Sequence, residues 1–154
     1  GGPAHLVITG SMSGLTVVPG NAAYQMSKHG TVALAETLYQ ELVDTEVDVS
    51  VLCPGYVATG ITTSDRNRPD ALQNENAPPP RAMAGGWTGD ATDALKAIAV
   101  PVEEVADRVL NAVREQRFWI FTHDNSDARL LSRFDAILEG RNPPLDPSAP
   151  GSDD

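Results

Sequence analysis

Three side chains within residues 11–28 could act together on an alcohol or a carbonyl: the hydroxyl of Ser11, the phenol of Tyr24 and the ammonium of Lys28. Tyr24 and Lys28 are four residues apart, so a helix here would stack them on one face, about 6 Å apart along its axis. Ser11 follows the apolar run 5–9, which is typical of a buried strand. A strand, a loop and a helix must therefore bring the three groups together.

The chemistry of such a trio follows from the ordinary behaviour of a phenol. A free phenol titrates near pH 10, whereas proton transfer is most efficient when the pKa of the catalytic group lies near the working pH. Closing a gap of roughly 3 units needs about 4 kcal/mol of preference for the phenolate. An ammonium within ~4–6 Å favours the phenolate, and a serine hydroxyl could hold the substrate oxygen beside the phenol. The three residue types predict a proton relay that interconverts an alcohol and a carbonyl.

A second group of residues follows the apolar run 47–53: Pro54 and Gly55 form a turn signal, and Val57 and Thr59 come next. Ser11, Tyr24-x-x-x-Lys28 and this Pro-Gly segment together resemble the short-chain dehydrogenase/reductase family, over most of residues 1–140. A Tyr–Lys pair at helical spacing is by itself more often a surface packing or cation–π contact. The combination, in this order and with the tyrosine at the usual offset of thirteen positions from the serine, is what indicates the family.

The resemblance implies an oxidoreductase that uses NAD or NADP. Ser11 would orient the substrate oxygen, Tyr24 would transfer the proton, and Lys28 would assist Tyr24. The residues expected to contact the cofactor are Tyr24, Lys28, Pro54, Gly55, Val57 and Thr59. Within this set, the Val57 backbone and the Thr59 hydroxyl would hold the nicotinamide carboxamide and Lys28 the ribose. Thr59 could instead be a helix cap. Two alternatives stay open: an epimerase or dehydratase of the same family, or a truncated, non-catalytic fragment.

Hydrophobic periodicity predicts an α/β fold with a Rossmann-like parallel sheet flanked by helices, of which this chain supplies three strands. The strands are expected at residues 5–9, 47–53 and 118–122. The helices are expected at about 22–44, with Asn21 as N-cap, at 101–116 and at 125–139. The apolar positions expected to face inward are, in chain order, Val32, Leu34, Ala35, Leu38 and Leu42; Val102, Val105, Ala106, Val109, Leu110 and Val113; and Leu130, Leu131, Phe134, Ile137 and Leu138.

The sequence contains no glycine-rich turn that would bind a dinucleotide pyrophosphate, because the glycines of residues 10–14 have the wrong spacing. Residues 1–140 are therefore expected to be the C-terminal part of a Rossmann-fold oxidoreductase domain, inactive by itself and exposing the strand at residues 5–9 as an edge. Residues 62–89 are expected to form a substrate loop, in which Met83 and Trp87 could contact substrate. The Pro- and Asp-rich residues 141–154 read as a disordered tail.

Composition narrows the range of partners. A net charge of −10 argues against nucleic acid or an anionic membrane surface as a partner, and no apolar run approaches the ~20 residues of a membrane span. Because Cys53 is the single cysteine, an internal disulfide is excluded, which indicates a cytoplasmic protein. Cys53 itself is expected to be a buried packing residue. The three histidines show no metal-ligand spacing, so no metal is expected. The resemblance implies a small-molecule substrate and a homodimer or homotetramer formed through the helix at residues 22–44.

Overall fold

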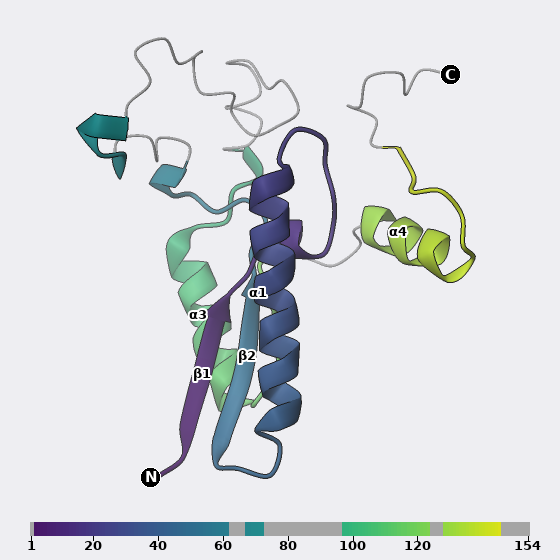
Figure 1. Ribbon diagram of the computed structural model, residues 1–154. Helices are drawn as coiled ribbons and strands as arrows, with labels where there is room; N and C mark the ends of the chain where they lie inside the picture. Colours follow the sequence, from purple (N-terminus) through teal and green to yellow (C-terminus); the bar gives the residue numbers. More distant parts are fainter. Residues whose placement is uncertain (1, 62–66, 73–96, 124–127, 146–154) are drawn as a thin grey trace.

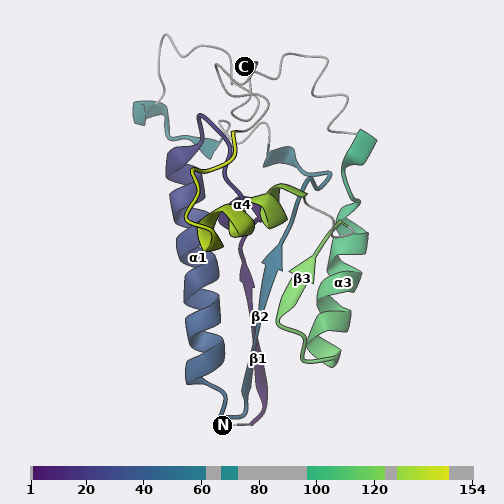
Figure 2. The same ribbon diagram turned by 90° about the vertical axis from the view of Figure 1, so that its right-hand side faces the viewer.

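The structure, a computed structural model, describes residues 2–61, 67–72, 97–123 and 128–145. Its centre is a parallel sheet of three strands in the order β1 (Ala4–Thr9), β2 (Val47–Cys53) and β3 (Trp119–Phe121). Helix α1 (Ala22–Glu41) covers one face of this sheet and helix α3 (Val102–Arg114) covers the other (Figures 1 and 2). The predicted α/β fold with a three-stranded parallel sheet is confirmed.

Two small apolar cores lie on the two faces of the sheet, because successive residues of a strand point to opposite sides. On the α1 side, Val51 and Cys53 pack with Val32 and Ala35. On the α3 side, Leu52 of β2 packs with two further buried residues, Ala112 and Ile120. The central strand β2 therefore contributes to both cores, and its carboxyl end is fixed between the two helices.

Helix α1 begins at Ala22 as predicted, but its cap and its end differ from the prediction. Asn21 occupies the N-cap position, but its side chain makes no capping hydrogen bond, so the predicted capping role is wrong. The preceding loop is held instead by Gln25, whose Nε2 donates to the Val18 carbonyl at 2.8 Å. The helix ends at Glu41 rather than near residue 44, because residues 42–46 form a turn in which Thr45 donates to the Leu42 carbonyl.

The apolar stripes of the helices are only partly covered. Val32 and Ala35 of α1 are buried as predicted, whereas Leu34 is 55% exposed. In α3, Val105 and Val109 pack on the sheet, but the predicted inward positions Val102, Ala106 and Leu110 are exposed. The stripes are wider than the face that three strands present to them.

The last helix, α4 (Ala128–Leu138), shows the largest departure. Four of its apolar residues that were predicted to face inward are between 46% and 83% exposed: Leu131, Phe134, Ile137 and Leu138. Leu130 is half-buried and Ala136 is buried. The helix lies across the outside of the α1 layer, where Arg133 donates to the Leu15 carbonyl at 3.1 Å (Figure 2). Periodicity identified an apolar face on this helix, but the packing leaves most of that face uncovered.

The remaining predictions concern the edge strand, the loop and the tail. β1 pairs only with β2 and so forms one edge of the described sheet. Most of the expected substrate loop, including Met83 and Trp87, lies outside the described residues, which contain only the short helix η3 (Asp70–Leu72) and residues 67–69. Residues 141–145 carry no helix or strand and are exposed; the rest of the tail also lies outside the described range. In the part of the chain that the structure describes, no helix has the length and apolarity of a membrane span.

Candidate active site

Ser11 lies just beyond the carboxyl end of β1, at the start of the short helix η1 (Met12–Gly14). Its backbone is extended, and its hydroxyl oxygen accepts a hydrogen bond from the amide of Ser13 at 3.1 Å. The residue is buried. Because a serine oxygen that accepts a bond keeps its own hydrogen, the Ser11 hydroxyl is fixed in place and can still donate.

Gly14 brings η1 into direct contact with α1. A Cβ atom at this position would lie 2.6 Å from the Lys28 carbonyl oxygen and 2.8 Å from Cγ2 of Val32. Such distances are too short for any residue with a side chain, so the close approach requires glycine. The sequence indicates only that the glycines of residues 10–14 do not form a pyrophosphate-binding turn; it does not reveal this long-range contact of Gly14.

Lys28 connects the helix to the end of β1. Its Nζ donates to the Thr9 carbonyl at 3.0 Å and lies 5.9 Å from the centroid of the Tyr24 ring, within the range of a cation–π contact. Lys28 and Tyr24 are both half-buried. The structure thus brings Tyr24 and Lys28 together at the carboxyl end of β1. The anchoring residue, Thr9, precedes Ser11 by two positions.

The link from Ser11 to the other two residues is indirect. Within the described residues, the Ser11 hydroxyl makes no hydrogen bond with Tyr24 or Lys28, and the Tyr24 hydroxyl has no hydrogen-bond partner. Ser11 is connected to Lys28 through the Thr9 carbonyl on one side and through the contact of Gly14 with α1 on the other.

Cys53 is a buried residue at the end of β2, close enough to Ser11 and Lys28 for both to affect its pKa. Its side chain is fully buried, and this burial is the main reason why its pKa rises from 9.0 to about 11; a backbone hydrogen bond from Ser11 opposes the shift, Glu36 adds to it and Lys28 opposes it. The thiol therefore stays protonated at neutral pH. This confirms the prediction of a buried packing residue rather than a reactive thiol.

The predicted cofactor residues of the Pro-Gly segment lie along one loop after β2. The Pro54 carbonyl accepts from the Met12 amide at 3.0 Å, which joins this loop to η1. Further along, Val57 forms a parallel bridge with Val100, in which Ala58 and Tyr56 provide the hydrogen bonds. Thr59 is exposed, so its hydroxyl is accessible. The carboxyl ends of β1 and β2 thus present both groups of predicted residues at one edge of the sheet, where open α/β sheets bind their ligands.

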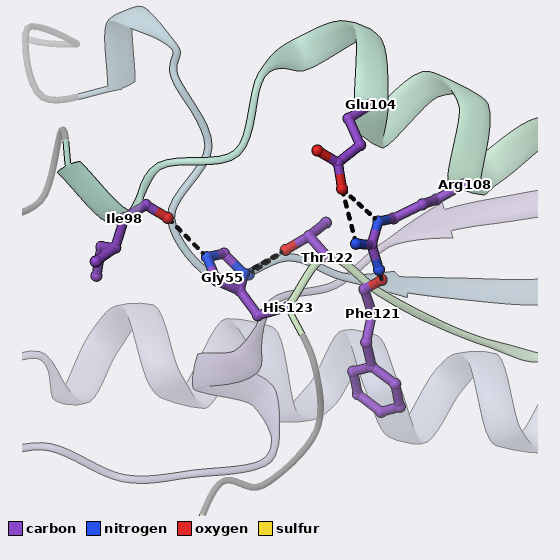
Figure 3. A network of polar contacts seen from close by, with 7 residues as sticks. All are labelled: Gly55, Ile98, Glu104, Arg108, Phe121, Thr122 and His123. Atoms are coloured by element: carbon purple, nitrogen blue, oxygen red, sulfur yellow. Dashed lines mark hydrogen bonds and ion pairs between the residues drawn. The ribbon is translucent and has the colours of Figure 1, made fainter.

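Sequence reasoning missed a polar network at the end of β3, shown in Figure 3. The Gly55 amide donates to Oγ1 of Thr122 at 3.0 Å, Oγ1 lies 2.9 Å from Nδ1 of His123, and Nε2 of His123 lies 3.0 Å from the Ile98 carbonyl oxygen. A signal was available, because Thr122 and His123 are a polar pair directly after an apolar strand. The spacing of the histidines in the sequence predicts only that His123 is not a metal ligand. Among the described residues no three His, Cys, Asp or Glu side chains gather as a metal site would require.

Comparisons with known proteins identify the family and agree with the fold. The family model described as short chain dehydrogenase matches residues 1–70. A crystal structure of a short chain dehydrogenase/reductase from Burkholderia phymatum in complex with NAD is 38% identical, with a TM-score of 0.80 over 94% of this chain and 52% of that chain. The chain belongs to the short-chain dehydrogenase/reductase family.

Two curated relatives of this chain also carry the word dehydrogenase in their names. The 1-deoxy-11-beta-hydroxypentalenate dehydrogenase of Streptomyces exfoliatus is 37% identical over 97% of the chain and 46% of the relative. The CLA biosynthesis dehydrogenase/reductase of Lactiplantibacillus plantarum is 26% identical over 88% of the chain and 48% of the relative. The chain therefore spans about half the length of the curated relatives that it matches.

Proposed function

We propose that the protein is an NAD(P)-dependent oxidoreductase that interconverts an alcohol and a carbonyl of a small molecule through Ser11, Tyr24 and Lys28. The observation that carries the proposal is the position of the Lys28 ammonium, which contacts both the Thr9 carbonyl at the end of β1 and the Tyr24 ring. The cation thus lies beside a phenol whose hydroxyl has no hydrogen-bond partner within the described residues, and its bond to Thr9 ends two residues before the buried Ser11. Membership of a family of named dehydrogenases supports the same reaction class.

Each of the three residues has a separate task. In the reductive direction Tyr24 donates a proton to the carbonyl oxygen, and the hydrogen of the Ser11 hydroxyl holds that oxygen in place, since the serine oxygen already accepts from Ser13. Lys28 stabilises the phenolate that remains after the transfer. An ammonium has three N–H groups and Thr9 uses one of them, so two remain for the substrate or the cofactor ribose.

The residues present fit a nicotinamide cofactor. When bound, NAD(P) supplies or accepts the hydride. The bridge of Val57 to Val100 uses the carbonyl of Tyr56 and the amide of Ala58, so the Val57 amide stays free within the described residues and could donate to the carboxamide. The exposed Thr59 hydroxyl could bind the same group. Pro54 and Gly55 set the turn that carries both residues.

Replacing Tyr24 by phenylalanine tests the proposal. In the full-length protein, Tyr24→Phe should lower turnover by about 10²- to 10⁴-fold, the usual contribution of a general acid, while the Kd for NADH or NADPH stays within about threefold of the wild-type value because the ring is kept. Tyr39→Phe is the matched control, since Tyr39 lies on the same helix and its ring packs against Phe118 in a tilted arrangement, away from the site. A Tyr24→Phe enzyme that keeps most of its rate would contradict the assignment.

The alternatives predict different products. An oxidoreductase consumes one NAD(P)H for each alcohol formed, whereas an epimerase or dehydratase shows no net consumption, and a non-catalytic fragment shows neither reaction.

Association of two or more copies through α1 is part of the same proposal. The small residues on the exposed surface of this helix would let another helix approach closely: Ala22, Ala23, Ser27 and Gly30. A cytoplasmic location is also proposed, on the basis of the single, buried cysteine.

A further inference from the structure

We propose that His123 is a positioning residue of the cofactor site: its imidazole braces the turn at Gly55 and thereby fixes the segment 54–59 that would hold the nicotinamide. This inference rests on the proposed function, because it assigns a supporting residue to the same site. Four observations carry it, namely the contact of the ring with Gly55, the direction of the hydrogen bonds, the segments they join and the way in which the end of β3 is held.

The imidazole lies directly against Gly55. A Cβ atom at Gly55 would stand 2.7 Å from Nδ1 and 2.9 Å from Cε1 of His123. Any side chain at position 55 would therefore displace the ring. The turn and the imidazole define each other's position, and Figure 3 shows the ring beside the Gly55 backbone.

The hydrogen-bond partners determine where the hydrogens lie. The Ile98 carbonyl can only accept, so Nε2 of His123 must carry a hydrogen. Thr122 is fully buried and its oxygen accepts from the Gly55 amide, which leaves its own hydrogen directed at Nδ1 of His123. In this neutral form, which is assigned from the partners, each donor has an acceptor. The network therefore runs in one direction, from Gly55 through Thr122 and His123 to Ile98.

The network joins three chain segments that meet at the proposed site. Gly55 follows β2, Thr122 and His123 follow β3, and Ile98 precedes α3. The segments after β2 and before α3 are joined a second time, by the bonds of Tyr56 and Ala58 to Val100 at 2.9 Å each. Segment 54–59 is thus fixed at two neighbouring points, and its backbone cannot shift at Gly55 without breaking a bond to a buried hydroxyl.

The end of β3 is held from α3. Arg108 donates to the Phe121 carbonyl at 3.3 Å and forms an ion pair with Glu104 at 2.7 Å, on the neighbouring turn of the same helix (Figure 3). This contact anchors the residue immediately before Thr122. His123 therefore transmits the position of a held strand end to the exposed Gly55 turn.

The test is a titration of the full-length protein with NADH or NADPH, whichever the wild-type protein binds more tightly, together with its Tm. His123→Ala should raise the Kd about three- to tenfold, the effect of losing hydrogen bonds that position a binding segment. His5→Ala is the matched control, because His5 also bonds a buried hydroxyl, Ser50, but at the opposite end of the sheet. It should lower Tm and change the Kd less than about twofold. If His123→Ala lowers Tm and leaves the Kd within that range, the residue is merely structural and the proposal is wrong.

A double-substitution cycle provides the second measurement. Gly55→Ala should weaken cofactor binding when His123 is present, because the new methyl group displaces the ring; it should weaken binding less in a His123→Ala background, where there is room for the methyl group. Additive effects would overturn the proposal. These binding measurements are independent of turnover, so a Tyr24→Phe enzyme that stays active would refute the proposed function and leave the result for His123 standing.

Discussion

The two ends of the β2–β3 pair carry the same chemistry with different partners. At the amino end, Nε2 of His5 lies 2.7 Å from the hydroxyl of Ser50, which donates to the Arg117 carbonyl at 2.7 Å. At the carboxyl end, His123 and Thr122 form the corresponding histidine–hydroxyl pair at 2.9 Å. The first pair joins β1, β2 and the turn before β3. The second joins segments that have already left the sheet.

Because the first pair joins parts of the sheet and the second joins segments beyond it, the first network has a structural role and the second can support ligand binding. The amino end has an open hollow of about 330 Å³, and His5 and Asp48 are among its lining residues. Its polar groups are nevertheless engaged within the sheet and its turns, for example by the bond of Gln116 to Asp48 at 2.8 Å. At the carboxyl end the Tyr24 hydroxyl is without a hydrogen-bond partner within the described residues. Unused polar groups, rather than the presence of a hollow, therefore distinguish the candidate site.

The largest effect on this comparison is expected from Gly14→Ala at the carboxyl end. The new methyl group would meet the Lys28 carbonyl at 2.6 Å, so η1 must move away from α1, at a cost of about 1–3 kcal/mol in unfolding free energy. Turnover should fall as well, because Ser11 moves with η1. The control for the unfolding free energy of the single chain is Gly30→Ala, which has open space around it within that chain and should stabilise α1 by up to about 1 kcal/mol. Equal effects of the two substitutions, measured by chemical denaturation and initial rates, would show that the contact with α1 is unimportant.

A smaller and purely structural effect is expected at the amino end from Ser50→Ala. Removing this buried hydroxyl leaves the Arg117 carbonyl and the His5 ring without their partner, which should cost about 1–2 kcal/mol of unfolding free energy. The Kd for NADH or NADPH should not change. Thr37→Ala, which removes an exposed hydroxyl from α1, should cost less than about 0.5 kcal/mol. Weaker cofactor binding in Ser50→Ala would remove the distinction between the two ends.

The smallest effect concerns Cys53 and appears only at high pH. Burial raises the pKa of this thiol from 9.0 to about 11, so the folded protein keeps the proton more strongly than the unfolded chain does. The stabilisation is therefore complete below pH 9 and is lost as the pH rises through about 11. Near pH 10 the loss should be about 1 kcal/mol. Unfolding curves between pH 8 and 10.5 should decline less steeply for Cys53→Ala; parallel slopes would contradict this account.

Local patterns in the sequence determined much of the molecule. Alternation and β-branched residues placed β2 at Val47–Cys53, as the structure has it, and the four-residue spacing placed Tyr24 beside Lys28. Both features depend on short-range geometry, since the period of a strand or a helix fixes which neighbouring side chains share a face. The order of Ser11, Tyr24, Lys28 and the Pro54-Gly55 turn was also sufficient to predict the family.

Other features depend on contacts between segments that are distant in the sequence, and only the tertiary structure reveals them. Only packing showed that Lys28 binds the Thr9 carbonyl, that Gly14 must be glycine, and that most of the apolar face of α4 lies exposed. Gly55 and Thr122 are 67 residues apart, so no local pattern could pair them. Periodicity gives the direction in which a side chain points, but what it meets there depends on segments that are distant in the chain.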